Sequence, residues 1–263
     1  MERMAGHTRF LPIAALALAI GGTPSLAQDA TFVLNSSDAR PFVVGERLTY
    51  NLRVGKIGKG TAVAEIKGID TIRGVPVFHT SFAVNGSMLF FKVRDYYESW
   101  FDPRSMVSLQ YRQDIDQGPY DRLRKYDIFP DRGVYFDSVK NVELPTSQGP
   151  LDDGSFLYFL RTIPLEVGKT YSFNRYFKPD RNPVVVTVVR RERVRVPAGE
   201  FDAIVLHPKI KAKGIFAEEA SAQVWVADDQ SRVMLMMRTK LPGVGTATFQ
   251  LRSREHLKDV AKR

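Results

Sequence analysis

The feature that most constrains the fold is a succession of short runs in which apolar and polar residues alternate, each bounded by Gly, Pro or Asp. Such alternation turns one side-chain face toward a core and the other toward solvent, as in antiparallel strands. The runs are residues 47–54, 61–66, 75–84, 93–101, 108–113, 133–136, 184–196, 203–211, 222–226, 233–239 and 246–252. They predict an all-β, mainly antiparallel fold. A sheet this large must curl or close to avoid long free edges, so we expect a barrel-like or half-barrel body.

One segment, residues 151–163, departs from the strand pattern. Asp152, Asp153 and Ser155 can accept hydrogen bonds from the free N–H groups of a helix start, and Pro164 stops a helix. The aromatic residues between them form an apolar face. We predict one short helix that packs this face against the sheet.

A faint internal repeat divides the chain. Gly45 and Gly168 lie 123 positions apart in similar contexts, the turns that lead to Phe78 and Phe201 follow at the same offset, and a Trp-containing strand follows in each half. Self-similarity in one order favours duplication, although chance alignment of Gly and aromatic residues is the alternative. We therefore predict a single β domain, 41–252, built from halves at about 41–113 and 164–252 that 114–163 joins. A linker at 28–40 and a charged tail at 253–263 flank it.

The N-terminus has the three zones of a cleavable export signal. Arg3 and Arg9 are basic, residues 10–20 are apolar, and small residues end the segment at Ala27. The apolar run is too short for a membrane anchor, which requires about 20 residues. We expect a signal peptide at 1–27, cleavage before Gln28 and a periplasmic protein. The chain has no Cys, so it has neither a lipidated cysteine nor disulfides.

The chain is basic, with a formal net charge of +9 that becomes +8 without residues 1–27. A positive charge favours binding to anionic partners such as a lipid or an anionic glycolipid, or peripheral contact with a membrane surface. The alternative is that the protein is simply soluble and basic. A nucleic-acid partner and a membrane-spanning segment are not expected.

Two apolar segments and one basic strand are the candidate binding residues. The segments, at 86–91 and 214–217, were interpreted as loops that contact an acyl chain or membrane, or that fold inward and cap the core. In residues 184–196, alternation places three Arg side chains on one face, either for an anionic head group or as a solvated outer face. The candidates are Met88, Leu89, Phe90, Phe91, Ile215, Phe216, Arg191, Arg193 and Arg195.

Enzyme signals are absent from the sequence. It has no Gly-x-Ser-x-Gly elbow, no zinc-protease motif and no phosphate-binding loop, and residues 55–60 are typical of a hairpin turn. His79, His207 and His256 lack a second ligand at metal spacing. We assign no catalytic residue, metal ligand or cofactor.

A family resemblance rests on several of these segments. Residues 196–204, with the sequence Val-Pro-Ala-Gly-Glu-Phe-Asp-Ala-Ile, are followed by Trp225 and Asp228. Together with residues 45–50, 60–62, 94–102 and 157–161, they resemble the bacterial exported family known as domain of unknown function 3108. The resemblance implies an exported β-rich protein and carries no activity with it.

These observations lead to ranked hypotheses about function. The first is a periplasmic, non-enzymatic protein that binds a lipid, glycolipid or other amphipathic ligand in envelope maintenance. The second is an envelope scaffold or assembly factor that binds another protein. A glycan-acting hydrolase is a distant third, and it would require paired carboxylates from distant strands in one pocket.

Overall fold

The computed structural model describes residues 40–88, 91–118, 120–210, 222–241 and 245–257. Within them lie one antiparallel sheet of 14 strands, one α-helix and one 3₁₀ turn. The elements are β1 (Glu46–Val54), β2 (Gly58–Ile72), β3 (Val75–Met88), β4 (Phe91–Phe101), β5 (Ser108–Gln117), β6 (Tyr120–Phe129), β7 (Val134–Asp137), β8 (Val142–Pro145), α1 (Asp153–Phe159), β9 (Thr170–Phe173), η1 (Pro179–Arg181), β10 (Val184–Val196), β11 (Gly199–Lys209), β12 (Gln223–Ala227), β13 (Met234–Leu241) and β14 (Gly245–His256). The predicted all-β fold is confirmed.

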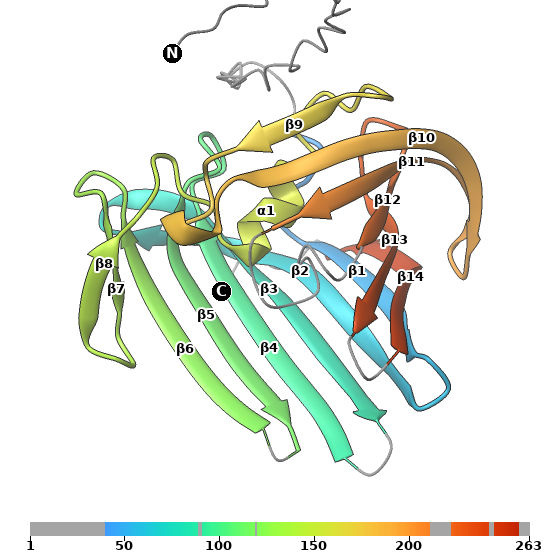
Figure 1. Ribbon diagram of the computed structural model, residues 1–263, viewed down its shortest axis with the longest axis horizontal. Helices are drawn as coiled ribbons and strands as arrows, with labels where there is room; N and C mark the ends of the chain where they lie inside the picture. The colour runs from blue at the N-terminus through green and yellow to red at the C-terminus, as the bar shows by residue number, and fades with distance from the viewer. Residues whose placement is uncertain (1–39, 89–90, 119, 211–221, 242–244, 258–263) are drawn as a thin grey trace, which may run out of the picture.

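The strands follow one another as hairpins, in the order β8-β7-β6-β5-β4-β3-β2-β1-β14-β13-β12-β11-β10-β9. Pairing of β1 with β14 joins the two ends of the chain into one sheet. The sheet curls around α1 (Figure 1), but its edge strands β8 and β9 do not pair with each other. The body is therefore a half-barrel, as predicted.

Irregular segments lie across the gap between the two edges. Leu151 forms a parallel bridge with Tyr176. The hydroxyl groups of Thr146 and Ser147 donate to the carbonyl oxygens of Phe177 and Tyr176, both at 2.7 Å. These bonds tie the chain before α1 to the chain after β9, so the open side of the sheet is bridged without a continuous ladder.

The two halves share backbone details. Gly45 and Gly168 both have φ +86°, and their N–H groups donate to Ile66 and Val188 respectively, each at 2.8 Å. Bulges interrupt the ladders at matching places, which are Ile66/Gly68 and Trp100/Phe101 in the first half and Val188/Arg190 and Trp225/Val226 in the second. Such local irregularities are features of particular sequences and not of sheets in general. They support the duplication hypothesis, which remains a proposal.

Helix α1 is shorter than the predicted 151–163. Asp152 is the N-cap, and its carboxylate accepts from the N–H groups of Gly154 at 2.7 Å and Ser155 at 3.0 Å. Leu151 lies outside because it is engaged in the bridge to Tyr176. The helix ends at Leu160. The N–H groups of Arg161 and Thr162 donate to carbonyl oxygens three residues earlier, as in a tighter turn. Its buried aromatic residues, Phe156 and Phe159, pack into the core as expected.

Three boundaries differ from the prediction. Gly86 to Met88 were interpreted as a loop, but they are the end of β3, whose pairing with β2 continues to Met88. The predicted connection 114–163 contains β6, whose many charged residues concealed the alternation. Strand β14 continues to His256, four residues into the predicted tail, because it pairs with β1 as far as Glu46.

No helix in the described part of the chain has the length and apolar character that crossing a membrane requires.

Candidate functional site

The curled sheet and α1 line an open cavity of about 900 Å³. Its walls come from β1 to β6, β13, β14, the start of α1 and η1. A second cavity of about 50 Å³ lies under α1 and shares Phe82 and Leu157 with the first. Only the large cavity has room for an organic ligand.

Small residues create the space. Gly60 pairs with Gly86 across β2 and β3, and a Cβ on Gly86 would lie 2.7 Å from the carbonyl oxygen of Lys59. Neither position therefore holds a side chain that could fill the cavity. Ala62 follows on β2, and Ala247 lines the cavity from β14. The concave face therefore carries no large side chain at these four positions.

The cavity has one apolar wall and one polar wall. Strands β1, β3, β13 and β14 supply the apolar wall, which includes Leu52, Val54, Val84, Met237 and Phe249. Strands β4, β5 and β6, with η1, supply the polar wall, which includes Asp95, Gln113, Gln117, Arg122, Arg124 and Arg181. The change from the apolar wall to the polar wall occurs along single cross-strand rows. In one such row, Val84, Asp95, Ile115 and Arg122 are in register on β3 to β6. Residues directly opposite in a ladder point to the same face.

Asp153, in the first turn of α1, organises part of the polar wall. Its carboxylate accepts from the hydroxyl groups of Tyr111 at 2.7 Å and Tyr176 at 2.9 Å and from the amide of Gln113 at 3.1 Å. Burial raises the pKa of Tyr111 and of Tyr176 well above the usual value, so both hydroxyls stay protonated and donate. Arg124 donates to the Gln113 oxygen at 2.7 Å. The carboxylate of Asp153 is therefore held in place by a network of hydrogen bonds.

Asp95 is the exception on this wall. One carboxylate oxygen accepts from the amide of Gln117 at 2.7 Å, but the other is buried and has no partner in the described part of the chain. The residue is 6% exposed. Burial raises the pKa of Asp95. An unpaired buried oxygen is costly, so this position calls for a hydrogen-bond donor from elsewhere.

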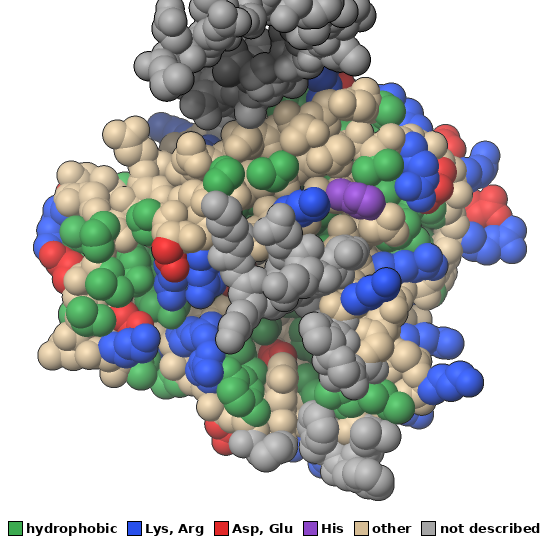
Figure 2. Space-filling model, viewed as in Figure 1, with side chains coloured by type: hydrophobic (Ala, Val, Ile, Leu, Met, Phe, Trp, Pro, Cys, Tyr) green, Lys and Arg blue, Asp and Glu red, His purple; other side chains and the backbone are tan. Residues whose placement is uncertain are grey.

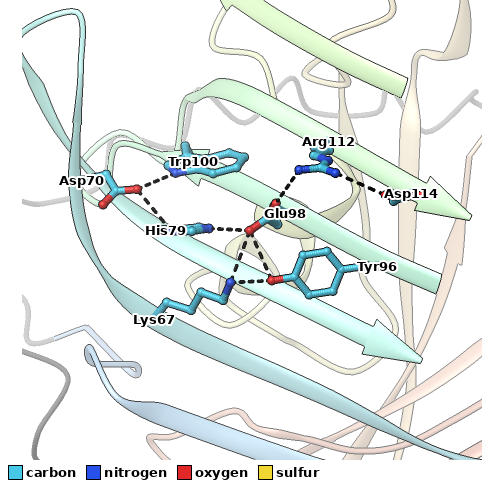
Figure 3. Close-up of polar contacts among 8 residues, drawn as sticks. All are labelled: Lys67, Asp70, His79, Tyr96, Glu98, Trp100, Arg112 and Asp114. Carbon is cyan, nitrogen blue, oxygen red and sulfur yellow. Dashed lines mark hydrogen bonds and ion pairs between the residues drawn. The ribbon is translucent and has the colours of Figure 1, made fainter. Parts of the chain in front are cut away.

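The opposite, outer face of β2 to β5 carries a polar cluster around Glu98 (Figure 3). His79 lies between Asp70 at 3.2 Å and Glu98 at 3.0 Å and stacks on Trp100, whose indole donates to Asp70. The remaining members, Lys67, Tyr96 and Arg112, also contact Glu98. The hydrogen bond from His79, opposed by burial and helped by Lys67, lowers the pKa of Glu98 to about 2. In this Glu98 cluster each acidic group is paired, although the Nε of Arg112 is buried without a partner in the described residues, and the pairing indicates a structural role.

The predicted site residues fall in separate places: Met88 and Phe91 pair across β3 and β4, and the three arginines lie on β10. Met88 lines the cavity from the end of β3. Phe91 begins β4. Leu89, Phe90, Ile215 and Phe216 lie outside the described residues.

The three predicted Arg residues share one exposed face of β10, as alternation indicated, and none lines the cavity. Arg191 pairs with Asp228 at 2.7 Å, Arg193 pairs with Glu200 at 3.5 Å, and Arg195 also pairs with Glu200. In Figure 2, basic and acidic side chains stand side by side at the right-hand end, where Figure 1 places the β10–β11 hairpin. Each of the three therefore has an acidic partner within the protein, although Arg193 and Arg195 share one carboxylate.

Sequence reasoning missed the polar wall. Arg122 and Arg124 alternate on β6, which, like the short strands β8 and β9, was not among the predicted runs, and Asp95 was part of a predicted strand without a role. The available signal was the alternation of Tyr120, Arg122 and Arg124, which is the period of a strand with charges on the unexpected face. Among the residues that the structure describes, no group of three or more acidic, His or Cys side chains is arranged to hold a metal ion.

The fold and the cavity define an open, β-barrel-like protein with a polar and apolar interior. The chain belongs to the family described as protein of unknown function DUF3108, which matches residues 47–252. The family resemblance drawn from the sequence is thus confirmed.

One solved structure shows the same kind of fold. A β-barrel-like protein of domain of unknown function DUF1849 from Brucella abortus is 11% identical, with a TM-score of 0.54, over 84% of this chain and 100% of that one. A DUF1089 family protein from Pseudomonas aeruginosa is 10% identical, with a TM-score of 0.33, over 90% and 98% of the two chains. The first likeness shows the fold alone. No curated protein sequence matches the chain.

Proposed function

We propose that this protein is a non-enzymatic binding protein that holds the apolar part of an amphipathic ligand in its cavity. The observation that carries the proposal is the division of one cavity of about 900 Å³ into an apolar and a polar wall. Ligand sites have volumes of about 300 to 1,000 Å³ and combine an apolar lining with a few polar groups. A lipid or glycolipid presents the same two chemistries.

The proposed location of the protein in the cell envelope rests on the sequence. The export signal expected at 1–27 lies outside the described residues. Electrophoresis and intact mass of protein recovered from the periplasm test it, and we expect a chain that begins at Gln28. Recovery of the full-length chain in the cytoplasm would contradict this part of the proposal without affecting the cavity.

A hydrolase would require free carboxylates in the cavity. Asp95 and Asp153 line it from different elements, but Asp153 is held by three donors. A carboxylate so engaged is a weak general base, because its lone pairs are already used. The hydrolase thus has less support in the described residues than ligand binding has.

The test is to fill the cavity. Ile115 lies on the polar side of the cavity in register with Arg122 and is partly exposed there. Ile115→Trp places a large ring in the cavity, whereas Asp116→Trp places the same ring on the outer face of the same strand. We expect Ile115→Trp to weaken the binding of lauroyl lipids, measured by their displacement of an apolar fluorescent dye, by at least about tenfold. Asp116→Trp should leave this affinity unchanged.

Two results would overturn the proposal. One is that the wild-type protein binds neither the dye nor any lauroyl lipid and carries no lipid in native mass spectra after purification without detergent. The other is that Ile115→Trp, shown by circular dichroism to be folded, binds as tightly as Asp116→Trp.

A further inference from the structure

We propose that the polar wall selects an anionic amphiphile that also carries a hydrogen-bond donor between its anionic group and its chain. Arg122, Arg124 and Arg181 would hold the anion, and Asp95 would accept from the donor. This inference rests on the proposed function, because it requires that the cavity holds the ligand.

The three arginines line the same cavity. Arg122 and Arg124 are two residues apart on β6 and line the cavity together, so their Cα atoms are about 7 Å apart. Arg181 reaches the same cavity from η1, which follows β9 in the chain. A phosphate or carboxylate can accept from two guanidinium groups at once, and such charge-assisted bonds are strong.

The charges of these three arginines are not neutralised by ion pairs within the described residues. No carboxylate of the described residues forms an ion pair with Arg122, Arg124 or Arg181; their nearest partners are the Tyr120 ring, the Gln113 amide and the Tyr176 hydroxyl. The arginines of β10 differ, since Arg191, Arg193 and Arg195 all pair with acids. The cavity therefore has a net positive charge, since Lys59 and the three arginines line it together with Asp95 and Asp153.

Asp95 supplies the second requirement. It lies two strands from Arg122, with Ile115 between them in register, so the two backbones are about 10 Å apart. Its buried oxygen without a partner needs a donor, such as a hydroxyl or an amide N–H. The long arginine side chain covers part of the distance, and a short polar spacer in the ligand would cover the rest.

The same row fixes the direction of the chain. Beyond Asp95 come Val84 on β3, Ala62 on β2 and Tyr50 on β1, followed by Leu251 on β14. Every position after Asp95 in this row is apolar or aromatic, and on β1 and β14 the neighbouring Leu52, Val54, Ala247 and Phe249 line the cavity itself. The ligand's anionic group would thus lie over β6, its donor at β4, and its chain toward β1 and β14.

A matched lipid series tests the selectivity. Lauroyl glycerol, lauroyl glycerol phosphate and lauroyl glycerol phosphocholine share the chain and a hydroxyl, and they are neutral, anionic and zwitterionic. We expect the anionic lipid to bind at least about tenfold tighter than the other two in isothermal titration below their critical micelle concentrations. Inorganic phosphate, as the probe for a free anion, should compete only weakly.

Paired variants assign the residues. The double variant Arg122→Gln/Arg124→Gln should remove the preference for lauroyl glycerol phosphate while lauroyl glycerol still binds, which also shows that the variant is folded. Arg191→Gln/Arg193→Gln removes the same charge from the outer face and should leave the preference unchanged. Asp95→Val should weaken lauroyl glycerol phosphate about tenfold but leave dodecyl phosphate, which has no hydroxyl between phosphate and chain, unaffected.

The outcomes separate the two proposals. If all three lipids bind equally, or if inorganic phosphate binds as tightly as lauroyl glycerol phosphate, the anionic selectivity is wrong and cavity binding of a chain is judged by Ile115→Trp alone. If the outer-face variant abolishes the preference as well, the effect is one of net charge and the assignment to Arg122 and Arg124 fails. If no lipid binds, the proposed function itself fails.

Discussion

Asp95 and Glu98 are acidic residues three positions apart on β4, and they face opposite sides of the sheet. Burial dominates at Asp95 and raises its pKa, whereas at Glu98 the hydrogen bond from His79 is the largest effect and the pKa falls to about 2. The same element thus holds one acid that needs a partner and one that has several. Side-chain direction on a strand decides between these environments.

We predict that the Glu98 cluster makes stability depend on pH in the acid range. Because the pKa of Glu98 falls from the usual 4.5 to about 2, its contribution is present above pH 4.5 and is lost as the pH falls toward 2. After allowance for solvent screening we expect about 1–2 kcal/mol. Urea unfolding at pH 6 and pH 3 measures it, and Glu98→Gln should lose less stability than wild type between these values. Equal losses would contradict the assignment.

A buried ion pair joins the end of α1 to the sheet. Arg161 pairs with Glu46 on β1, and their side chains are 5% and 4% exposed. Arg161 also donates to the carbonyl oxygens of Ser231 and Pro41, while Arg254 on β14 contacts the same Glu46. Four separate segments therefore meet at one pair of charges.

Removal of one partner should be strongly destabilising. We predict that Arg161→Met lowers the free energy of unfolding by about 3–5 kcal/mol, since Glu46 would stay buried with less compensation. The double variant Arg161→Met/Glu46→Leu should recover much of the loss. Urea unfolding of both variants measures this, and a double variant as unstable as the single one would show that the carbonyl contacts of Arg161 matter more than the charge pair.

At the scale of elements, the turns before β1 and β9 show how a repeated conformation acquires different surroundings. Gly45 and Gly168 have the same positive φ. A Cβ on Gly45 would overlap the carbonyl oxygen of Leu257, whereas a Cβ on Gly168 would meet nothing within 4 Å. The second turn is at the sheet edge, and the first lies beside β14.

This difference predicts unequal costs for the same substitution. Gly168→Ala should lower stability by about 1 kcal/mol, which is the conformational cost alone. Gly45→Ala should cost more, because the backbone or the β1–β14 pairing near Leu257 must also move. Thermal or urea unfolding of the two variants compares them, and equal losses would show that the close approach to Leu257 is relaxed without penalty.

The elements also show how far local pattern carries. The helix start was predictable because Asp152 and Ser155 form a capping box, a purely local device. Strand β6 was missed because Arg122 and Arg124 occupy the inward face, where a pattern-based prediction expects apolar residues. The predicted helix began too early because Leu151 is engaged in a bridge to Tyr176, which is far from it in sequence.

At the scale of the whole molecule, the sheet is one continuous structure. The ladder of β1 with β14 pairs Glu46–Val54 with Ala247–His256, so each half completes its inner edge on the other. Helix α1 packs on β3 and β4 of the first half, while the chain that leads from it enters the second. Neither half has its own closed core.

We therefore predict a single cooperative unfolding transition. Far-UV circular dichroism and Trp fluorescence should report the same midpoint in urea, because Trp100 and Trp225 lie in different halves. Separately expressed halves, 28–150 and 151–263, should not fold alone. Two resolved transitions, or a folded half, would mean that the β1–β14 ladder contributes little to the coupling.

The sequence by itself determined the local conformations: alternating runs become antiparallel strands, Asp152 caps a helix, and glycines turn the chain, because each depends on a few neighbouring residues. The family followed from the same segments. Only the tertiary structure decided which strand face lines a cavity, that Arg122, Arg124 and Asp95 line it, and that the arginines of β10 pair with acids outside it. The physical reason is that alternation assigns side chains to two faces, but the curl of the whole sheet and the pairing of β1 with β14 decide which face is inside.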